Sequence, residues 1–143
     1  MSGFGFPIRR VGGGRTAGLK ETGKRRSNMK KFIYLFRSHP AAYQSMSAEQ
    51  MQQVMKKWME WRGALEKNGH IHQLGDRLDG TGKVVRGKVK SVSDGPYVEV
   101  KDFIQGFLIL NAKDLDQAAE LAKGCPILEG DGTVEIRPFV SAQ

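Results

Sequence analysis

Four charged side chains in the second half of the chain have the types and spacing of a binding site. Asp94 and Glu99 supply acceptors, while Arg86 and Arg137 supply a cationic clamp for a small polar molecule. Asp94 precedes Gly95-Pro96, which predicts a turn beside a strand, either a plain hairpin turn or a loop that carries a ligand. If the protein is an enzyme, Asp94 or Glu99 is the best candidate for a general base, given enough burial to raise its pKa. The pattern leaves open whether the site is catalytic.

Glu135 and Arg137 alternate with the apolar Ile136 near the C-terminus. On a strand the two charged side chains share a face and Ile136 points the other way. If that face is covered, both charges need partners, because lone buried charges are very costly. The pair therefore has two interpretations, a ligand-binding role and an ion pair that fixes the strand register.

His70 and His72 lie two residues apart and, on a strand, share a face with Leu74 and Asp76. Two imidazoles and a carboxylate have the chemistry of a zinc or iron site. The alternative is that both histidines are partly exposed residues after a helix end. A single His-x-His pair is a weak metal motif, so we predict no metal site.

Two stretches resemble nucleotide-binding motifs only in part. Residues 12–17 have the spacing of a dinucleotide fingerprint, but no strand precedes them and no clear helix follows. Gly82-Lys83 suggests a phosphate loop, but Arg77 stands where that motif needs Gly, and Val84 replaces Ser or Thr. We therefore expect no nucleotide and no other cofactor.

The composition is that of one ordinary domain. The chain has 143 residues, of which 39% are hydrophobic and 27% charged, and no apolar run approaches the ~20 residues of a membrane span. The single Cys125 cannot form an internal disulfide, which fits a reducing compartment. We expect a cytoplasmic protein without a membrane partner.

The basic character is concentrated at the N-terminus. The net charge is +8, but residues 1–28 hold seven Lys/Arg and one acid, so residues 29–143 contribute only +2. Residues 1–28 are rich in Gly and Arg, which predicts a disordered extension ahead of a domain at 29–143. Met29 is then either the biological initiator or the end of a basic arm that touches nucleic acid. Beyond nonspecific contact by this tail we expect no nucleic-acid partner, because a nucleic-acid-binding domain carries its basic patch on folded elements.

Hydrophobic periodicity and capping signals predict the elements of the domain. Ser47 and Gln50 form a capping box ahead of an apolar stripe that contains Trp58 and Trp61. Asp114 and Gln117 repeat the capping pattern later in the chain. The predicted helices span 48–68 and 114–123, and the predicted strands span 30–37, 70–74, 83–87, 88–92, 106–110 and 133–139.

This order predicts a ferredoxin-like α+β domain, with a mostly antiparallel sheet and two helices on one face. The strands at 30–37 and 106–110, however, are apolar on both of their faces. Two helices cover only one face, so the second face needs another cover, most simply the sheet of a second copy. We therefore expect a homodimer of the dimeric α/β-barrel type.

The combined motifs resemble the DGPF proteins of the YCII-related superfamily over about residues 29–143. The matching segments are Met29-Lys30-Lys31-Phe32, the helix with Trp58 and Trp61, Asp94-Gly95-Pro96-Tyr97, Glu99-x-Lys101, Gly106-Phe107, Asp114-Leu115-Asp116-Gln117-Ala118, Ala122, Cys125-Pro126 and Glu135-Ile136-Arg137-Pro138. Tyr97 stands where the family name has Phe. The resemblance implies a dimeric ferredoxin-like domain.

The same resemblance implies two alternative roles. Some YCII-like relatives are thought to be enzymes with a His–Asp pair whose His lies in the first helix, but residues 48–68 contain no His, so that pair is not transferred. DGPF proteins are often associated with sigma factors, which implies a noncatalytic regulatory module linked to transcription. The main hypothesis remains a YCII-related homodimer that binds a small polar molecule and is a possible enzyme.

Overall fold

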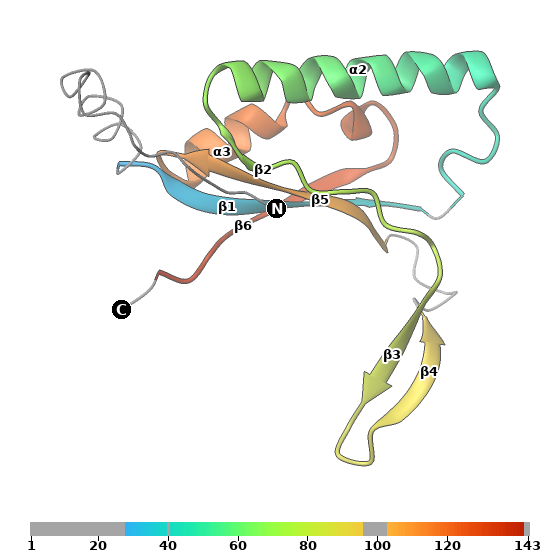
Figure 1. Cartoon of the computed structure of the whole chain (residues 1–143). Helices are drawn as coiled ribbons and strands as arrows, with labels where there is room; N and C mark the ends of the chain where they lie inside the picture. The colour runs from blue at the N-terminus through green and yellow to red at the C-terminus, as the bar shows by residue number, and fades with distance from the viewer. Residues whose placement is uncertain (1–27, 40, 96–102, 142–143) are drawn as a thin grey trace, which may run out of the picture.

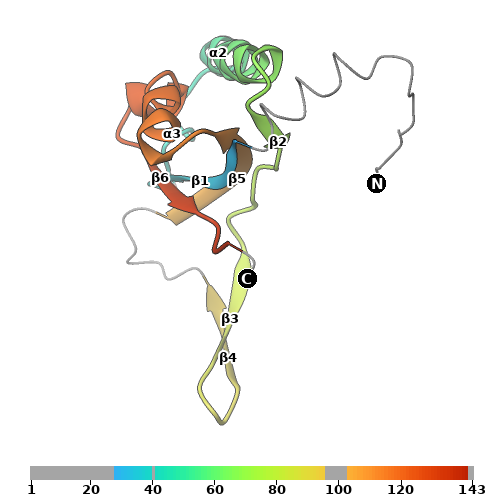
Figure 2. The ribbon, with the colours of Figure 1, turned by 90° about the vertical axis from the view of Figure 1, so that its left-hand side faces the viewer.

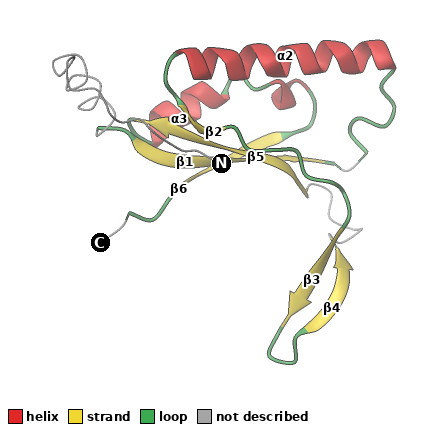
Figure 3. Cartoon of the chain, viewed as in Figure 1, coloured by secondary structure: helices red, strands yellow, loops and turns green. Residues whose placement is uncertain are grey.

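The computed structural model describes residues 28–39, 41–95 and 103–141. The predicted basic extension, apart from Asn28, lies outside these ranges. The chain builds six strands and two α-helices within them (Figure 1, Figure 3). In order they are β1 (Lys30–Ser38), α2 (Ala48–Lys67), β2 (Ile71–Gln73), β3 (Gly82–Arg86), β4 (Ser91–Gly95), β5 (Phe103–Ala112), α3 (Leu115–Ala122), a 3₁₀ turn (Pro126–Glu129) and β6 (Thr133–Pro138).

The main sheet has the strand order β2-β5-β1-β6, and every pairing in it is antiparallel. Both α2 and α3 lie on one face of this sheet (Figure 1, Figure 2). The arrangement confirms the predicted ferredoxin-like α+β fold. Strands β3 and β4 form a separate two-stranded hairpin inserted between β2 and β5. No helix among the described residues is long and apolar enough to cross a membrane.

Helix α2 begins where the capping box predicts. The Ser47 Oγ accepts a hydrogen bond from the Gln50 backbone N–H at 3.1 Å, and the Ser47 N–H donates to the Gln50 Oε1 at 2.9 Å. The helix ends at Asn68, and Gly69 follows at φ +78°, a conformation that favours glycine. Both ends of this helix are therefore determined by local sequence.

The core lies between the helices and the sheet. Tyr34 and Leu110 are fully buried, and their neighbours on alternate strand positions are buried with them. The Tyr34 ring stacks on Trp61 at a centroid distance of 5.9 Å, and the Trp61 indole N–H donates to the Leu121 carbonyl at 3.0 Å. These contacts join β1, α2 and α3 around one cluster.

The opposite face of the sheet carries a second apolar stripe. Ile33 pairs with Ile109 and Leu35 pairs with Phe107 across β1 and β5, and all four are partly exposed. This face lies on the side of the sheet away from α2 and α3 (Figure 1). The two-sided apolar character that the sequence predicts for these strands is therefore present, and only one side is covered by the described helices.

The β3–β4 hairpin projects from the domain on the side of the sheet opposite the helices (Figure 1, Figure 2). Its turn uses positive φ angles at Gly87 (+73°) and Lys90 (+59°). The prediction of a strand at 88–92 is therefore wrong by about three residues, because the backbone reverses direction over residues 87–90 and β4 begins at Ser91. Asp94 and Gly95 belong to the strand rather than to a turn, while Pro96 lies outside the described residues.

Candidate functional site

Asp94 lies in β4 on the projecting hairpin. Its carboxylate accepts a hydrogen bond from the Lys83 Nζ at 2.7 Å, across the directly paired position of β3. The Asp94 side chain is 91% exposed, so it faces solvent in the protomer. Glu99, its predicted companion acceptor, falls outside the described residues.

The two predicted cations lie in different sheets. Arg86 is exposed and pairs with Ser91, next to the hairpin turn and at the other end of the ladder from Asp94. Arg137 is exposed on β6, opposite Ile33 of β1. The structure thus brings Asp94 and Arg86 onto one hairpin and leaves Arg137 on the main sheet.

Glu135 forms an ion pair, but its partner is Arg37 rather than Arg137. The Arg37 Nε donates to the Glu135 Oε1 at 2.8 Å, and the two side chains are 31% and 37% exposed. The pair links β1 to β6 on the open face of the sheet. This contact favours the interpretation in which Glu135 belongs to an ion pair that fixes the strand register, rather than a ligand-binding role.

His70 and His72 differ in their surroundings. His70 is buried, and its Nδ1 lies 2.8 Å from the Asn111 carbonyl oxygen. His72 is exposed on β2. Within residues 28–39, 41–95 and 103–141, no group of three or more His, Cys, Asp or Glu side chains is placed to hold a metal. His70 therefore has a structural partner on the neighbouring strand.

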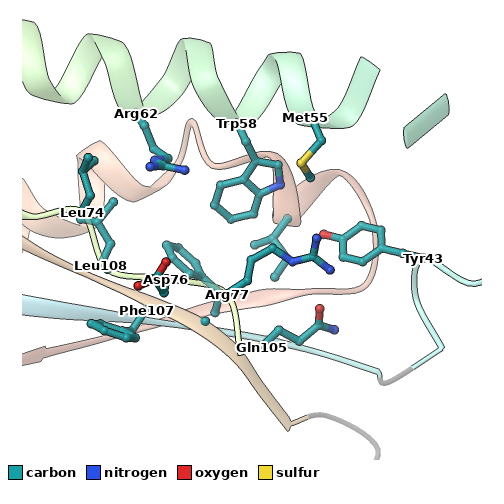
Figure 4. A pocket seen from close by; sticks show the side chains of 14 residues that line it. Tyr43, Met55, Trp58, Arg62, Leu74, Asp76, Arg77, Gln105, Phe107 and Leu108 are labelled. Carbon is teal, nitrogen blue, oxygen red and sulfur yellow. The ribbon is translucent and has the colours of Figure 1, made fainter. Parts of the chain in front are cut away.

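A pocket with a volume of about 360 Å³ lies between α2 and the edge of the sheet, and it is called the main pocket because charged and aromatic side chains line it together (Figure 4). This volume is within the range of small-molecule sites. The wall is largely apolar and aromatic, and the polar groups come from four separate segments of the chain. The lining residues are Phe36, Tyr43, Met55, Trp58, Arg62, Leu74, Gly75, Asp76, Arg77, Gln105, Gly106, Phe107, Leu108 and Ile127.

One wall of the pocket depends on a close approach of two backbones. Gly75 has φ +70°, and a Cβ there would lie 2.0 Å from the Phe107 carbonyl oxygen. A Cβ on Gly106 would lie 2.8 Å from the Asp76 carbonyl oxygen. These glycines let the Phe107 N–H donate to that Asp76 oxygen at 3.2 Å. The close crossing positions Asp76 and Arg77 at the pocket.

Helix α2 supplies the opposite wall. Met55, Trp58 and Arg62 follow one another at helical spacing and so share a face of the helix. The Trp58 ring meets the Phe36 ring edge-on at 5.0 Å, which fixes the indole against the sheet. Arg62 is absent from the site residues predicted above, and its position within this apolar stripe is the sequence signal that could have identified it.

Tyr43 closes the pocket from the loop before α2. Burial raises the pKa of the Tyr43 hydroxyl, while the nearby Trp58 side chain and the Arg77 charge lower it in part. The net direction is upward, so Tyr43 is a neutral phenol at physiological pH. It therefore offers a hydrogen-bonding hydroxyl rather than a negative charge.

Three charged residues line this pocket: Arg62, Asp76 and Arg77 (Figure 4). Among the described residues, neither guanidinium has a hydrogen bond to an acceptor or a carboxylate within 4.0 Å. The Arg62 Nε is buried and has no acceptor. The pocket thus combines an aromatic wall with two cations that pair with no carboxylate in the described part of the chain.

The fold and the pocket define the class: a ferredoxin-like α+β domain with a small-molecule-sized cavity between a long helix and its sheet. A comparison with protein families then identifies the YCII-related domain over residues 31–142. The chain therefore belongs to the YCII-related family, as the motifs around Asp94 and Gly106 predict. Among curated proteins, none matches the chain.

Proposed function

We propose that this protein binds a small organic molecule in the pocket between α2 and β5 and does so as a homodimer. The single observation that supports binding is the convergence of Arg62, Asp76 and Arg77 on an aromatic-walled cavity of about 360 Å³. Binding sites typically combine a mostly apolar wall with a few convergent polar groups. The pocket has both parts.

A substitution that fills the pocket tests this proposal. Leu74 and Leu78 are both partly solvent-exposed leucines, at 41% and 46%, but only Leu74 lines the pocket. A thermal-shift screen with a library of small metabolites is expected to yield a stabilising compound for the wild type. Leu74→Trp should abolish that stabilisation, whereas Leu78→Trp should retain it. A library without a stabilising compound, or equal responses from the two variants, would refute binding in this pocket.

The homodimer is supported by the open face of the sheet. The pairs Ile33–Ile109 and Leu35–Phe107 form an apolar centre, and the Arg37–Glu135 ion pair lies beside them. An apolar centre with a polar rim is the usual anatomy of an interface between subunits. A second copy related by a two-fold axis presents the same stripe and offers the simplest cover. Sedimentation velocity should give a dimer for the wild type and a monomer for Leu35→Glu.

Catalysis by Asp94 or Glu99 stays a prediction. In the protomer the Asp94 side chain is exposed and paired with Lys83, so it lacks the burial that tunes a general base. If Asp94 acts in catalysis or ligand binding, Asp94→Asn should abolish turnover or weaken binding of the screened compound. A variant that responds like wild type would exclude Asp94, together with the site built around it.

A second candidate function is the noncatalytic regulatory module linked to a sigma factor. It is favoured by the hairpin, on which Val85, Val89 and Val92 are 64%, 87% and 60% exposed. Exposed apolar groups on a projecting element are typical of interaction surfaces. A sigma factor should bind the full chain and lose binding to the V85S/V89S/V92S variant. Binding that survives this change, or no binding at all, argues against the hairpin as a regulatory contact.

A further inference from the structure

The charges in the main pocket indicate what kind of molecule it takes. Arg62 comes from α2 and Arg77 from the segment between β2 and β3, and Figure 4 shows Trp58 between them in that view. Asp76 is the one acidic residue among the described residues that line the pocket, so together their side chains carry a net positive charge. A cationic, partly desolvated cavity attracts negatively charged ligands.

Arg62 has an incomplete set of hydrogen bonds, whereas Arg77 is exposed, so water can reach its donors. A buried donor without an acceptor costs free energy, and native structures leave few of them. The Arg62 Nε is such a donor, and neither guanidinium has a carboxylate within 4.0 Å among the described residues. A planar guanidinium matches the oxygens of a carboxylate or phosphate, so an anion in the pocket would pair with two charges that lack a carboxylate partner among the described residues.

The apolar wall indicates the rest of the ligand. Trp58 and Phe36 present their rings in the same cavity, with Leu74 and Leu108 beside them. Such a wall favours a flat apolar body that contacts the rings. We propose that the pocket binds a small aromatic or similarly planar organic anion, with its carboxylate or phosphate at Arg62 and Arg77. This inference rests on the proposed function and specifies the ligand class of the same site.

Matched probes test the charge preference on the unmodified full chain. Benzoate and phenyl phosphate carry an anion on an aromatic ring, benzamide is a neutral counterpart of benzoate, and benzylamine is a cation. The indole N–H resonance of Trp58 reports the pocket in NMR titrations. That of Trp61 serves as an internal reference, because its N–H is bonded to the Leu121 carbonyl in the core. We expect the two anions to shift the Trp58 signal and the other two probes to leave it unchanged.

Arginine variants then test the residues. Arg62→Gln and Arg77→Gln should each weaken benzoate binding at least about tenfold, the loss of one charge-assisted contact. Lys56→Gln is the matched control, because Lys56 lies on the same helix, is exposed and does not line the main pocket. An unchanged Trp61 resonance shows that each variant is folded. Arginine variants that bind as tightly as Lys56→Gln would overturn the assignment.

The remaining outcomes separate this inference from the proposed function. If benzamide binds as well as benzoate, the pocket binds small molecules but the anion preference is refuted. Tighter binding of benzylamine means that Asp76 sets the charge preference, which also refutes it. If none of the four probes binds while a neutral metabolite from the screen does, the anion inference fails and the binding site stands. If neither the metabolite screen nor the four probes yields a bound compound, both small-molecule binding in this pocket and the anion preference are refuted.

Discussion

The two faces of the main sheet are built by the same strands but have different surroundings. Along β1 and β5, alternate side chains point to opposite faces. One set, with Tyr34 and Leu110, is fully buried beneath the helices. The other set, with Leu35 and Ile109, is partly exposed. The covered face determines the stability of the protomer, while the open face is available for association.

The polar groups on the two faces also differ in how they are paired and in how exposed they are. On the covered face the Tyr34 hydroxyl donates to the Ala118 carbonyl at 2.6 Å, which satisfies a buried group with backbone. On the open face Arg37 and Glu135 pair with each other while about a third exposed. A buried hydrogen bond is costly to break, whereas a solvated ion pair contributes little. The following substitutions test this contrast, from the largest expected effect to the smallest.

Leu110→Ala and Ile109→Ala compare neighbouring residues on opposite faces. Leu110→Ala should lower the free energy of unfolding by about 2–5 kcal/mol, because it leaves a cavity in a closed core. Ile109→Ala should cost clearly less in the isolated protomer and should weaken the proposed dimer. Urea unfolding at two protein concentrations measures both quantities. Equal and concentration-independent losses would contradict the contrast between the faces.

The pH dependence of the unfolding free energy tests whether Cys125 is buried on the covered side of the sheet. Burial raises the pKa of the Cys125 thiol to about 12, from an ordinary value near 9. The folded state therefore holds this proton more tightly than the unfolded chain does. Its contribution is complete below about pH 9 and is lost as the pH rises toward 12, a loss of roughly 2–3 kcal/mol by pH 11.

The pH dependence of Cys125→Ala isolates that contribution. The variant retains Tyr34 and the lysines, so the alkaline slope of its unfolding free energy reports every group except the thiol. The wild type should lose stability more steeply than the variant between pH 9 and 12. Parallel curves for the two proteins would show that the thiol is not desolvated as its 2% exposure implies.

Tyr34→Phe removes a single buried hydrogen bond. The Ala118 carbonyl oxygen then loses its hydroxyl donor, while the ring can still stack on Trp61. The free energy of unfolding should fall by about 1 kcal/mol, the usual net contribution of one hydrogen bond. Chemical denaturation with unchanged m-value is the measurement, and a loss below a few tenths of a kcal/mol would contradict the role of this contact.

Glu135→Gln should have the smallest effect. The substitution removes the charge opposite Arg37 on a solvated face, so the unfolding free energy should fall by about 1 kcal/mol or less. The difference should shrink further in 1 M salt, where charges are screened. A large salt-independent loss would instead indicate that a second copy buries this pair.

Local signals in the sequence predict much of the fold. The Ser47–Gln50 box marks the start of α2, and the continuous apolar runs within β1 and β5 predict that both faces of these strands are apolar. The hairpin register is the exception: Val92 continues an alternating pattern, but its strand begins at Ser91 because the backbone reverses over residues 87–90. Periodicity identifies strands more reliably than it identifies where a turn begins.

The candidate pocket is less predictable, because its polar residues come from segments far apart in the chain. Arg62 lies on α2, and Asp76 and Arg77 follow β2. No motif links these positions. The motif at Asp94 is compact in sequence, yet its described residues, Asp94 and Gly95, lie on the hairpin and do not line this pocket.

The sequence by itself determines the family, the α+β architecture and the two-sided apolar character of the central strands, because each depends on local spacing. Only the tertiary structure reveals which charged residues share a cavity. Gly75 and Gly106 let one segment cross close to β5, and that crossing brings Arg77 to the same pocket as Arg62. Such a contact depends on how distant backbones pack, so no short stretch of sequence contains it.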